Sequence, residues 1–389
     1  MNRELDEITG LLFPLVSECV FGTEHNLPEQ DELSGKLPAL YRLSKKHDIA
    51  HLVACSLKKR GMLSQEDISQ KLNQQLMLAV LRCEKIQRDT DAVCRLLEAE
   101  KIDFILLKGT VLREYYPEPW MRTSSDVDIL IHPEDSRRAT AALTEKLSYE
   151  SERNVDYEIS FYSPGKVHFE LHHDLREKET VACTQQLLQQ VWEYVIPQEG
   201  WQHQYRMQNE FFYFYHLAHM AKHMVFGGTG IRSFIDIQIM EDKMEFDRER
   251  LEQLLQSGGL RKFYEFCTRL CAVWFGNRPH DDTTRMGQRY ILLGGIYGNR
   301  ENRIAVYQSR DGGKIAYAMK RIFPSQREMK LLYPVLQKHP VLTPVCHACR
   351  WCRLVFGGRL RSAAQEFKIN AQTGQEVQTA TKLFDEIGL

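Results

Sequence analysis

The sequence predicts an α+β fold, in which a small mixed sheet with helices lies between an N-terminal and a C-terminal helical region. Three observations support this prediction. Both ends of the chain carry apolar residues at helical spacing, the middle carries short β-branched runs broken by Gly and Pro, and 389 residues can form two or three packed units. We expect the boundaries at 1–98, 99–178 and 179–389.

The N-terminal region, 1–98, predicts a helical scaffold. Leu11, Leu12 and Leu15 recur at intervals that place them on one helix face. A longer stretch over 69–97 keeps apolar residues three or four positions apart and contains neither Gly nor Pro. This stretch therefore predicts one long amphipathic helix.

The middle region, 99–178, alternates between strand and turn signals. Apolar runs end at loop residues or at a proline, as strands do. We expect strands over 104–107, 126–132, 157–163 and 166–173, with an amphipathic helix over 134–147. Strands and a helix within so short a stretch form a small α+β unit.

The C-terminal region, 179–389, is again predicted to be mainly helical. Its apolar spacing predicts helices over 180–194, 209–226, 231–243, 247–257 and 260–276. The segment 279–330 is mixed in character and predicts no definite elements.

Composition indicates a soluble, cytoplasmic protein. Hydrophobic residues make up 43% and charged residues 26% of the chain. No run of about 18 apolar residues is present, and the first residues lack the features of a signal peptide. The ten cysteines are scattered, which is typical of a reducing compartment. We therefore expect no membrane partner.

The net charge of −1 gives no indication of the strongly basic face that binds long nucleic acid. The charge balance favours a small molecule or a protein as substrate over an RNA.

Three acidic residues in the middle region are candidate metal ligands. Asp126 and Asp128 are two positions apart in a predicted strand, so their side chains point to the same face. Glu170 occupies a corresponding position in another predicted strand, with Glu158 and Asp174 as alternatives for the third ligand. Carboxylates arranged in this way can bind a pair of divalent cations such as Mg²⁺. We therefore predict Asp126, Asp128 and Glu170 as metal ligands and catalytic residues.

A loop upstream of these acids has the residues that a triphosphate needs. Gly109 allows close approach of the backbone and a positive φ if the turn requires one. The hydroxyl of Thr110 can donate a hydrogen bond, and Lys108 or Arg122 can supply positive charge. Together with Ser125, these residues form the predicted nucleotide-binding set.

These motifs resemble the polymerase-beta-like nucleotidyltransferase superfamily. Its signature is an apolar strand, then Gly-Gly or Gly-Ser, a spacer, Asp-h-Asp/Glu (h, apolar) and a later carboxylate between apolar residues. The corresponding segments here are 107–110, 125–129 and 169–171. More narrowly, Leu-Lys-Gly, Arg-x-x-Ser-Asp-h-Asp-h-Leu and Glu-Leu-His are similar to the uncharacterised nucleotidyltransferase family within it.

The resemblance implies a polymerase-beta-like palm that binds an NTP donor, with ATP favoured, and two Mg²⁺ ions, with Mn²⁺ as a substitute. It implies nucleotidyl transfer to an acceptor hydroxyl or phosphate. The motifs cover residues 104–172, and the helical half is similar more loosely. Thr110 departs from the signature, which more often has Gly or Ser at that position.

Several residues are candidates for an acceptor pocket. His172 lies on the same strand face as Glu170, and His219 and His223 lie one helical turn apart. The family also tends to carry spaced histidines followed by a helix with an Asp, here Asp236. A place in the core or the pocket wall is favoured for His219 and His223, and His172 could simply border the site. Asp236 could anchor one of the histidines or cap the pocket.

The sequence leaves three further alternatives open. Cys346, Cys349 and Cys352 are spaced as in part of a zinc or iron–sulfur site, although a stripe of thiols on one helix is favoured. The palm could also be a catalytically silent module that binds nucleotides or partners. A kinase is the weaker alternative, because the phosphate-binding and catalytic loops of kinases are missing.

Overall fold

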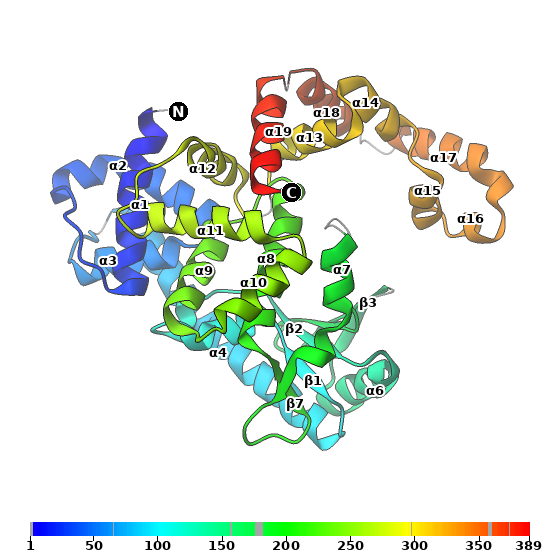
Figure 1. Cartoon of the computed structure of the whole chain (residues 1–389), viewed down its shortest axis with the longest axis horizontal. Helices are drawn as coiled ribbons and strands as arrows, with labels where there is room; N and C mark the ends of the chain where they lie inside the picture. The colour runs from blue at the N-terminus through cyan, green and yellow to red at the C-terminus, as the bar shows by residue number, and fades with distance from the viewer. Residues whose placement is uncertain are drawn as a thin grey trace.

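In the computed structural model, helices surround one mixed seven-stranded sheet, which confirms the α+β class (Figure 1). The structure describes residues 3–64, 66–155, 158–175, 182–296, 298–356, 360–372 and 374–389. Parts of three predicted segments lie outside these residues. They are residue 157 of the strand expected at 157–163, residues 180–181 of the helix expected at 180–194, and residues 176–178 of the unit expected at 99–178.

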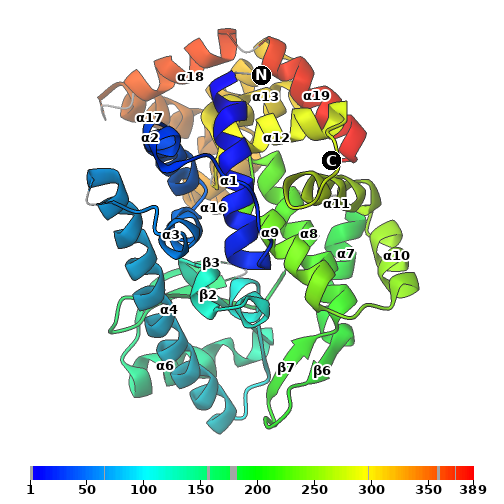
Figure 2. The ribbon, with the colours of Figure 1, turned by 90° about the vertical axis from the view of Figure 1, so that its left-hand side faces the viewer.

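The N-terminal region is helical, as predicted. It contains α1 (Arg3–Phe21), α2 (Gln30–Lys46), α3 (Ala50–Lys59) and α4 (Asp67–Ala99). Helix α4 has 33 residues and runs beside the sheet (Figure 2). Its side chains differ in burial, since Leu97 is fully buried whereas Leu78 is 52% exposed.

The sheet has the strand order β3-β4-β5-β2-β1-β7-β6. Its strands are β1 (Phe104–Leu106), β2 (Asp126–Ile131), β3 (Glu150–Val155), β4 (Glu158–Tyr162), β5 (His168–His172), β6 (Val195–Pro197) and β7 (Gln204–Met207). Strand β2 pairs in parallel with β5, and β1 pairs in parallel with β7, while the other pairs are antiparallel.

Strands β1, β2, β4 and β5 match the predicted ones, whereas β3, β6 and β7 were not expected. Strand β3 is polar in sequence and lies at one edge of the sheet, so it lacks the apolar alternation that predicts a strand. Strand β6 lies at the other edge, and it and β7 have three and four residues, which is too short for a periodic signal.

Apart from the one-turn helix that follows β1, the connecting and C-terminal helices agree closely with the predictions up to residue 276. They are α5 (Gly109–Leu112), α6 (Ser136–Leu147), α7 (Ala182–Gln189), α8 (Asn209–Val225), α9 (Ile231–Lys243), α10 (Arg248–Ser257) and α11 (Arg261–Trp274). The helix expected at 180–194 is shorter than predicted, since α7 ends at Gln189 and a 3₁₀ turn follows at Val191–Tyr194.

The segment that gave no clear prediction, 279–330, is helical. It forms α12 (Asp282–Gly294), α13 (Arg300–Asp311), α14 (Lys314–Ile322) and α15 (Gln326–Leu332). The chain continues through α16 (Val335–Lys338), α17 (Thr343–Phe356), α18 (Leu360–Gln372) and α19 (Gln375–Ile387). Glycines and prolines separate these helices at short intervals, which hides their periodicity in the sequence.

Two main clusters of buried side chains lie on opposite faces of β2. Val127, Ile129 and Ile131 point to a cluster shared with α4 and α6. Leu130 points to the larger cluster, which includes residues of α1 to α3, α8 to α13 and α19. The alternation predicted for β2 is therefore confirmed.

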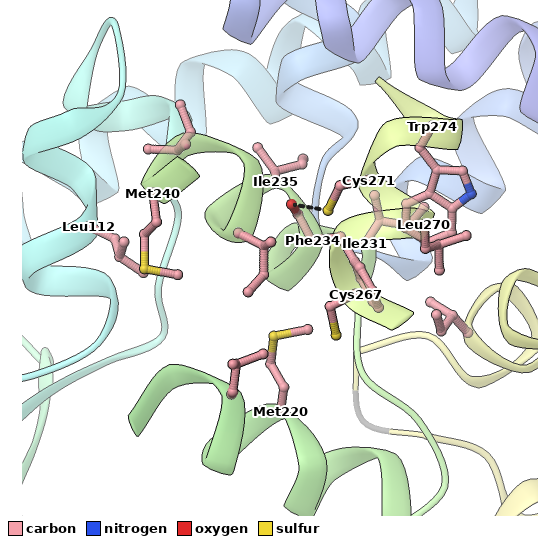
Figure 3. Packing of buried hydrophobic residues seen from close by; sticks show 14 of the residues in the cluster. Leu112, Met220, Ile231, Phe234, Ile235, Met240, Cys267, Leu270, Cys271 and Trp274 are labelled. Carbon is pink, nitrogen blue, oxygen red and sulfur yellow. Dashed lines mark hydrogen bonds between the residues drawn. The ribbon is translucent and has the colours of Figure 1, made fainter. Parts of the chain in front are cut away.

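The larger cluster fixes α8 and α9 in place. Figure 3 shows Met220 of α8 packed with side chains of α9 and α11. The buried thiol of Cys271 donates a hydrogen bond to the carbonyl oxygen of Phe234 at 3.3 Å, joining α11 to α9. Cys267 is also fully buried, as expected for thiols that act as small hydrophobic side chains.

Candidate active site

The parallel pairing of β2 with β5 brings the predicted metal ligands together. Asp128 lies opposite Glu170 in the register, and Asp126 lies opposite His168. Two groups of side chains have ligand atoms within 4.8 Å of one another: one contains Asp126, His168 and Glu170, and the other contains Asp128, Glu170 and His172. The structure therefore places all three predicted carboxylates side by side.

These carboxylates line a cavity of about 320 Å³. One wall comes from the sheet and its loops, and includes Lys108, Gly109, Arg122, Ser125, Asp126, Asp128, Glu158, Glu170, His172 and Asp174. The facing wall comes mainly from α8 and α9, and includes Tyr215, His216, His219, Lys222, His223, Arg232 and Ser233. Glu158 and Asp174, the alternatives for the third ligand, thus remain within the same cavity as Glu170.

Asp128 is the most strongly paired of the three acids. It is 4% exposed, and its Oδ1 accepts from Nζ of Lys108 at 2.9 Å and lies 2.8 Å from Nε2 of His172. Burial alone would raise the pKa of Asp128, but the charges of Lys108 and His172 outweigh it and hold the pKa well below its usual range. Asp128 is therefore ionised at neutral pH.

The neighbouring groups respond to the same charges. Burial lowers the pKa of His172, but its hydrogen bonds to Asp128 and Glu170 dominate and raise the pKa to about 9. Burial, followed by the charge of Asp128, raises the pKa of Asp126. Three acids that repel one another in this way favour binding of a cation.

The donor set fits a hard divalent ion. Carboxylate oxygens are the ligands that Mg²⁺ and Mn²⁺ take in proteins, and Asp126, Asp128 and Glu170 offer them from adjacent strands. His168, which the sequence prediction did not include, belongs to the same group of ligand atoms. Its position two residues before Glu170, on the same strand face, is the signal that could have identified it.

The loop after β1 has an unusual backbone at Lys108. Its φ of +47° is rare for a residue with a side chain and indicates local strain. The positive φ considered for Gly109 therefore falls one residue earlier. A Cβ atom at Gly109 would lie 3.2 Å from Nη1 of Arg122, so a larger residue at this position would crowd that guanidinium.

Of the other three predicted nucleotide-binding residues, two line the cavity and one does not. Ser125 and Arg122 line it, but Thr110 is buried and is not among the lining residues. The backbone N–H of Thr110 donates to the carbonyl oxygen of Leu107 at 3.2 Å.

Arg122 is held by a buried network that reaches α9. Its Nε donates to Oδ1 of Asp236 at 2.7 Å, its Nη1 donates to the carbonyl oxygen of Thr123 at 2.6 Å, and the hydroxyl of Tyr116 donates to the same Asp236 oxygen at 2.7 Å. Burial would raise the pKa of Asp236, but the charge of Arg122 outweighs it and lowers the pKa. Asp236 is fully buried and is not among the lining residues, so it contacts the cavity through Arg122.

Two histidines of the α8 wall form a close pair. Nε2 of His219 and Nε2 of His223 lie 3.0 Å apart, as their spacing of one helical turn allows. On α9, Nη1 of Arg232 donates to Oδ2 of Asp48 at 2.8 Å, so this guanidinium both lines the cavity and pairs with an acid. Asp48 follows α2 and had no distinguishing signal in the sequence.

The cysteine stripe lies on α17, far along the chain from the cavity residues. Cys346 is buried, whereas Cys349 and Cys352 are exposed. Within the described part of the chain, no group of metal ligands includes these three thiols.

The α+β fold thus places three adjacent carboxylates and the loop at Lys108 and Gly109 on one wall of a cavity, an arrangement that can hold a divalent cation. Residues 34–276 match the family described as uncharacterised nucleotidyltransferase, and the chain belongs to that family. The match contains every predicted site residue, from Lys108 to Asp236. Searches of curated proteins and of solved structures found no match.

Proposed function

We propose that the protein transfers a nucleoside monophosphate from an NTP to an acceptor hydroxyl or phosphate and releases pyrophosphate. The observation that carries this proposal is the convergence of Asp126, Asp128 and Glu170 with the Lys108–Gly109 loop on one wall of a single cavity. The family assignment supports the same reaction class. We further propose that β1, β2 and β5 form a polymerase-beta-like palm.

Asp126, Asp128 and Glu170 would hold two Mg²⁺ ions, or Mn²⁺ in their place. When bound, such ions neutralise phosphate charge and lower the pKa of the acceptor hydroxyl. Lys108 and Arg122 supply fixed positive charge near the triphosphate, and Gly109 keeps the loop close to the guanidinium of Arg122.

Proton transfer and acceptor binding fall to other residues of the cavity. Glu170 is the candidate base for the acceptor proton, because its carboxylate lies beside Asp128 in the register. His172, His219 and His223 line the space where the acceptor would bind. A cavity of about 320 Å³ suits a small molecule or a protein side chain, and ATP is the favoured donor.

Isothermal titration calorimetry tests this proposal directly. The purified protein is titrated with each of the four NTPs, with and without Mg²⁺, beside the variant Asp126→Asn/Asp128→Asn. We expect one NTP to bind in the presence of Mg²⁺, and we expect this binding to disappear in the variant. The control variant Asp67→Asn/Glu84→Gln changes two exposed carboxylates of α4 and should bind like the unchanged protein.

Binding without turnover would still leave the chemistry open, so the NTP that binds is next incubated with candidate acceptors while pyrophosphate release is measured. A folded protein that binds no NTP under these conditions would instead be a catalytically silent partner-binding module.

A further inference from the structure

The segment from Lys314 to Phe356, called here the basic arm, concentrates exposed apolar side chains. It contains α14 to α17 and projects from the rest of the molecule in Figure 1. Eleven of the sixteen exposed large hydrophobic residues within the described ranges belong to it. Ile315, Val341 and Phe356 are 82%, 88% and 87% exposed. So many exposed apolar side chains in one short segment indicate a binding surface.

The same segment is strongly basic. The sequence from Lys314 to Phe356 contains eight Lys and Arg residues and one acid, Glu328, which gives a net charge of +7. Because the whole chain has a net charge of −1, the remainder has −8. The charge of the arm is therefore opposite to that of the body, and it complements an anionic surface.

The arm is folded, but its own core is small. Met329, Leu336 and Cys346 form the buried cluster within it. Nη2 of Arg350 donates to the carbonyl oxygen of Arg321 at 2.7 Å, and Nε1 of Trp351 donates to the carbonyl oxygen of Ile322 at 3.3 Å. These bonds join α17 to α14 and leave many of the apolar side chains of both helices facing outward.

We propose that the basic arm docks the protein onto an anionic lipid surface. Apolar side chains that enter the boundary between headgroups and acyl chains, combined with Lys and Arg that contact anionic headgroups, are the two features of interfacial binding. Proteins bind RNA mainly through its phosphate charges and through bases stacked on aromatic side chains. Exposed aliphatic side chains such as Ile315 and Val341 contribute to neither kind of contact. The arm therefore favours lipid over RNA.

This contact is peripheral. Among the described residues, no helix is long and apolar enough to cross a membrane. The proposal differs from the expectation of no membrane partner, because the sequence alone does not show that the apolar side chains of the basic arm are exposed. It is independent of the proposed reaction, because the arm lies outside the family match at 34–276 and contributes no residue to the cavity.

Flotation with lipid vesicles tests the proposal. The full chain is mixed with vesicles of phosphatidylcholine alone, or of phosphatidylcholine with phosphatidylglycerol, at low and at physiological salt. We expect binding to the anionic vesicles only, and we expect it to weaken as salt rises. Brominated lipids should quench the fluorescence of the unchanged protein more than that of Trp351→Phe.

Two variants separate the roles of charge and apolar contact. Lys320→Gln/Lys338→Gln should lower the vesicle partition coefficient about fivefold for each removed charge. Val341→Ser/Phe356→Ser should lower it by at least as much, because both side chains are almost fully exposed. The matched controls, Lys146→Gln/Lys166→Gln and Met77→Ser/Leu78→Ser, change exposed residues of the body and should partition like the unchanged protein.

Circular dichroism and urea unfolding of each variant establish that the fold is intact. Failure of the folded protein to bind anionic vesicles would overturn the proposal. Binding of homopolymer RNA that is lost in the lysine variant but not in the apolar variant, without vesicle binding, would assign the arm to RNA instead.

Discussion

At the scale of single residues, the cavity depends on a chain of contacts that begins outside it. Asp236 and Tyr116 hold Arg122, and Arg122 in turn lies against Gly109. A guanidinium fixed by a buried carboxylate cannot move away without leaving that charge unpaired. The position of Lys108 and Gly109 therefore depends in part on Asp236 and Tyr116, which do not line the cavity.

The variant Gly109→Ala tests this chain of contacts. The added Cβ would meet Nη1 of Arg122 at 3.2 Å and displace either the loop or the guanidinium. We expect nucleotidyl transfer to fall about tenfold to a hundredfold, because small displacements of positioning groups have effects of this size. Gly35→Ala is the control, since nothing lies within 4 Å of its Cβ position. Equal activity of the two variants would contradict the proposed role of Gly109.

At the scale of elements, the sequence could predict those helices and strands whose apolar residues recur at a regular spacing. The alternation around Asp126 and Glu170 identified β2 and β5 because each strand has a polar face toward the cavity and an apolar face toward α4. It could not predict the parallel pairing of these strands, which depends on the order of the whole sheet. It also gave no sign of Asp48 or Tyr116, whose roles arise from contacts between distant segments.

Helix α4 allows one substitution to be compared at two positions of the same element. Leu97→Ala removes a fully buried side chain and should lower the free energy of unfolding by about 2–5 kcal/mol. Leu78→Ala changes a side chain that is 52% exposed and should alter it by less than about 0.5 kcal/mol. Chemical denaturation of both variants measures the difference. Similar losses at the two positions would mean that α4 does not face the sheet as described.

At the scale of the whole molecule, His47 joins three regions. It follows α2, its Nδ1 accepts from the backbone N–H of Ile231 at the start of α9, and its Nε2 lies 3.3 Å from the carbonyl oxygen of Leu292 in α12. The ring must therefore be neutral, with its proton on Nε2. Burial lowers the pKa of His47 to about 4, and burial lowers that of His216 on α8 to about 4 as well.

These two histidines predict acid sensitivity. Both folded-state pKa values lie below the unfolded value of 6.5, so the stabilisation is fully present above pH 6.5 and is lost as the pH falls toward 4. Each ring can contribute up to about 3 kcal/mol over this interval. Urea unfolding from pH 7 to pH 4 should show the decline.

The variant His47→Gln provides the check on this assignment, because glutamine does not titrate. Its free energy of unfolding should depend less steeply on pH than that of the unchanged protein, whatever its absolute level. Replacing the exposed His339 with Gln should leave the slope unchanged. An unchanged slope in His47→Gln would assign the acid sensitivity to other groups.

The larger buried cluster determines how far the protein can be truncated without loss of its fold. Phe13 of α1 stacks on Trp274 at 4.6 Å, and Phe384 of α19 contacts Tyr290 edge-on at 5.6 Å. The family match covers only 34–276, but the buried cluster includes residues of α1 and α19, which lie outside it. The segment needed for a stable fold is therefore longer than the segment that defines the family. A shortened version that keeps only residues 34–276 would expose this interior to solvent, and we expect it to aggregate rather than to form a stable smaller protein.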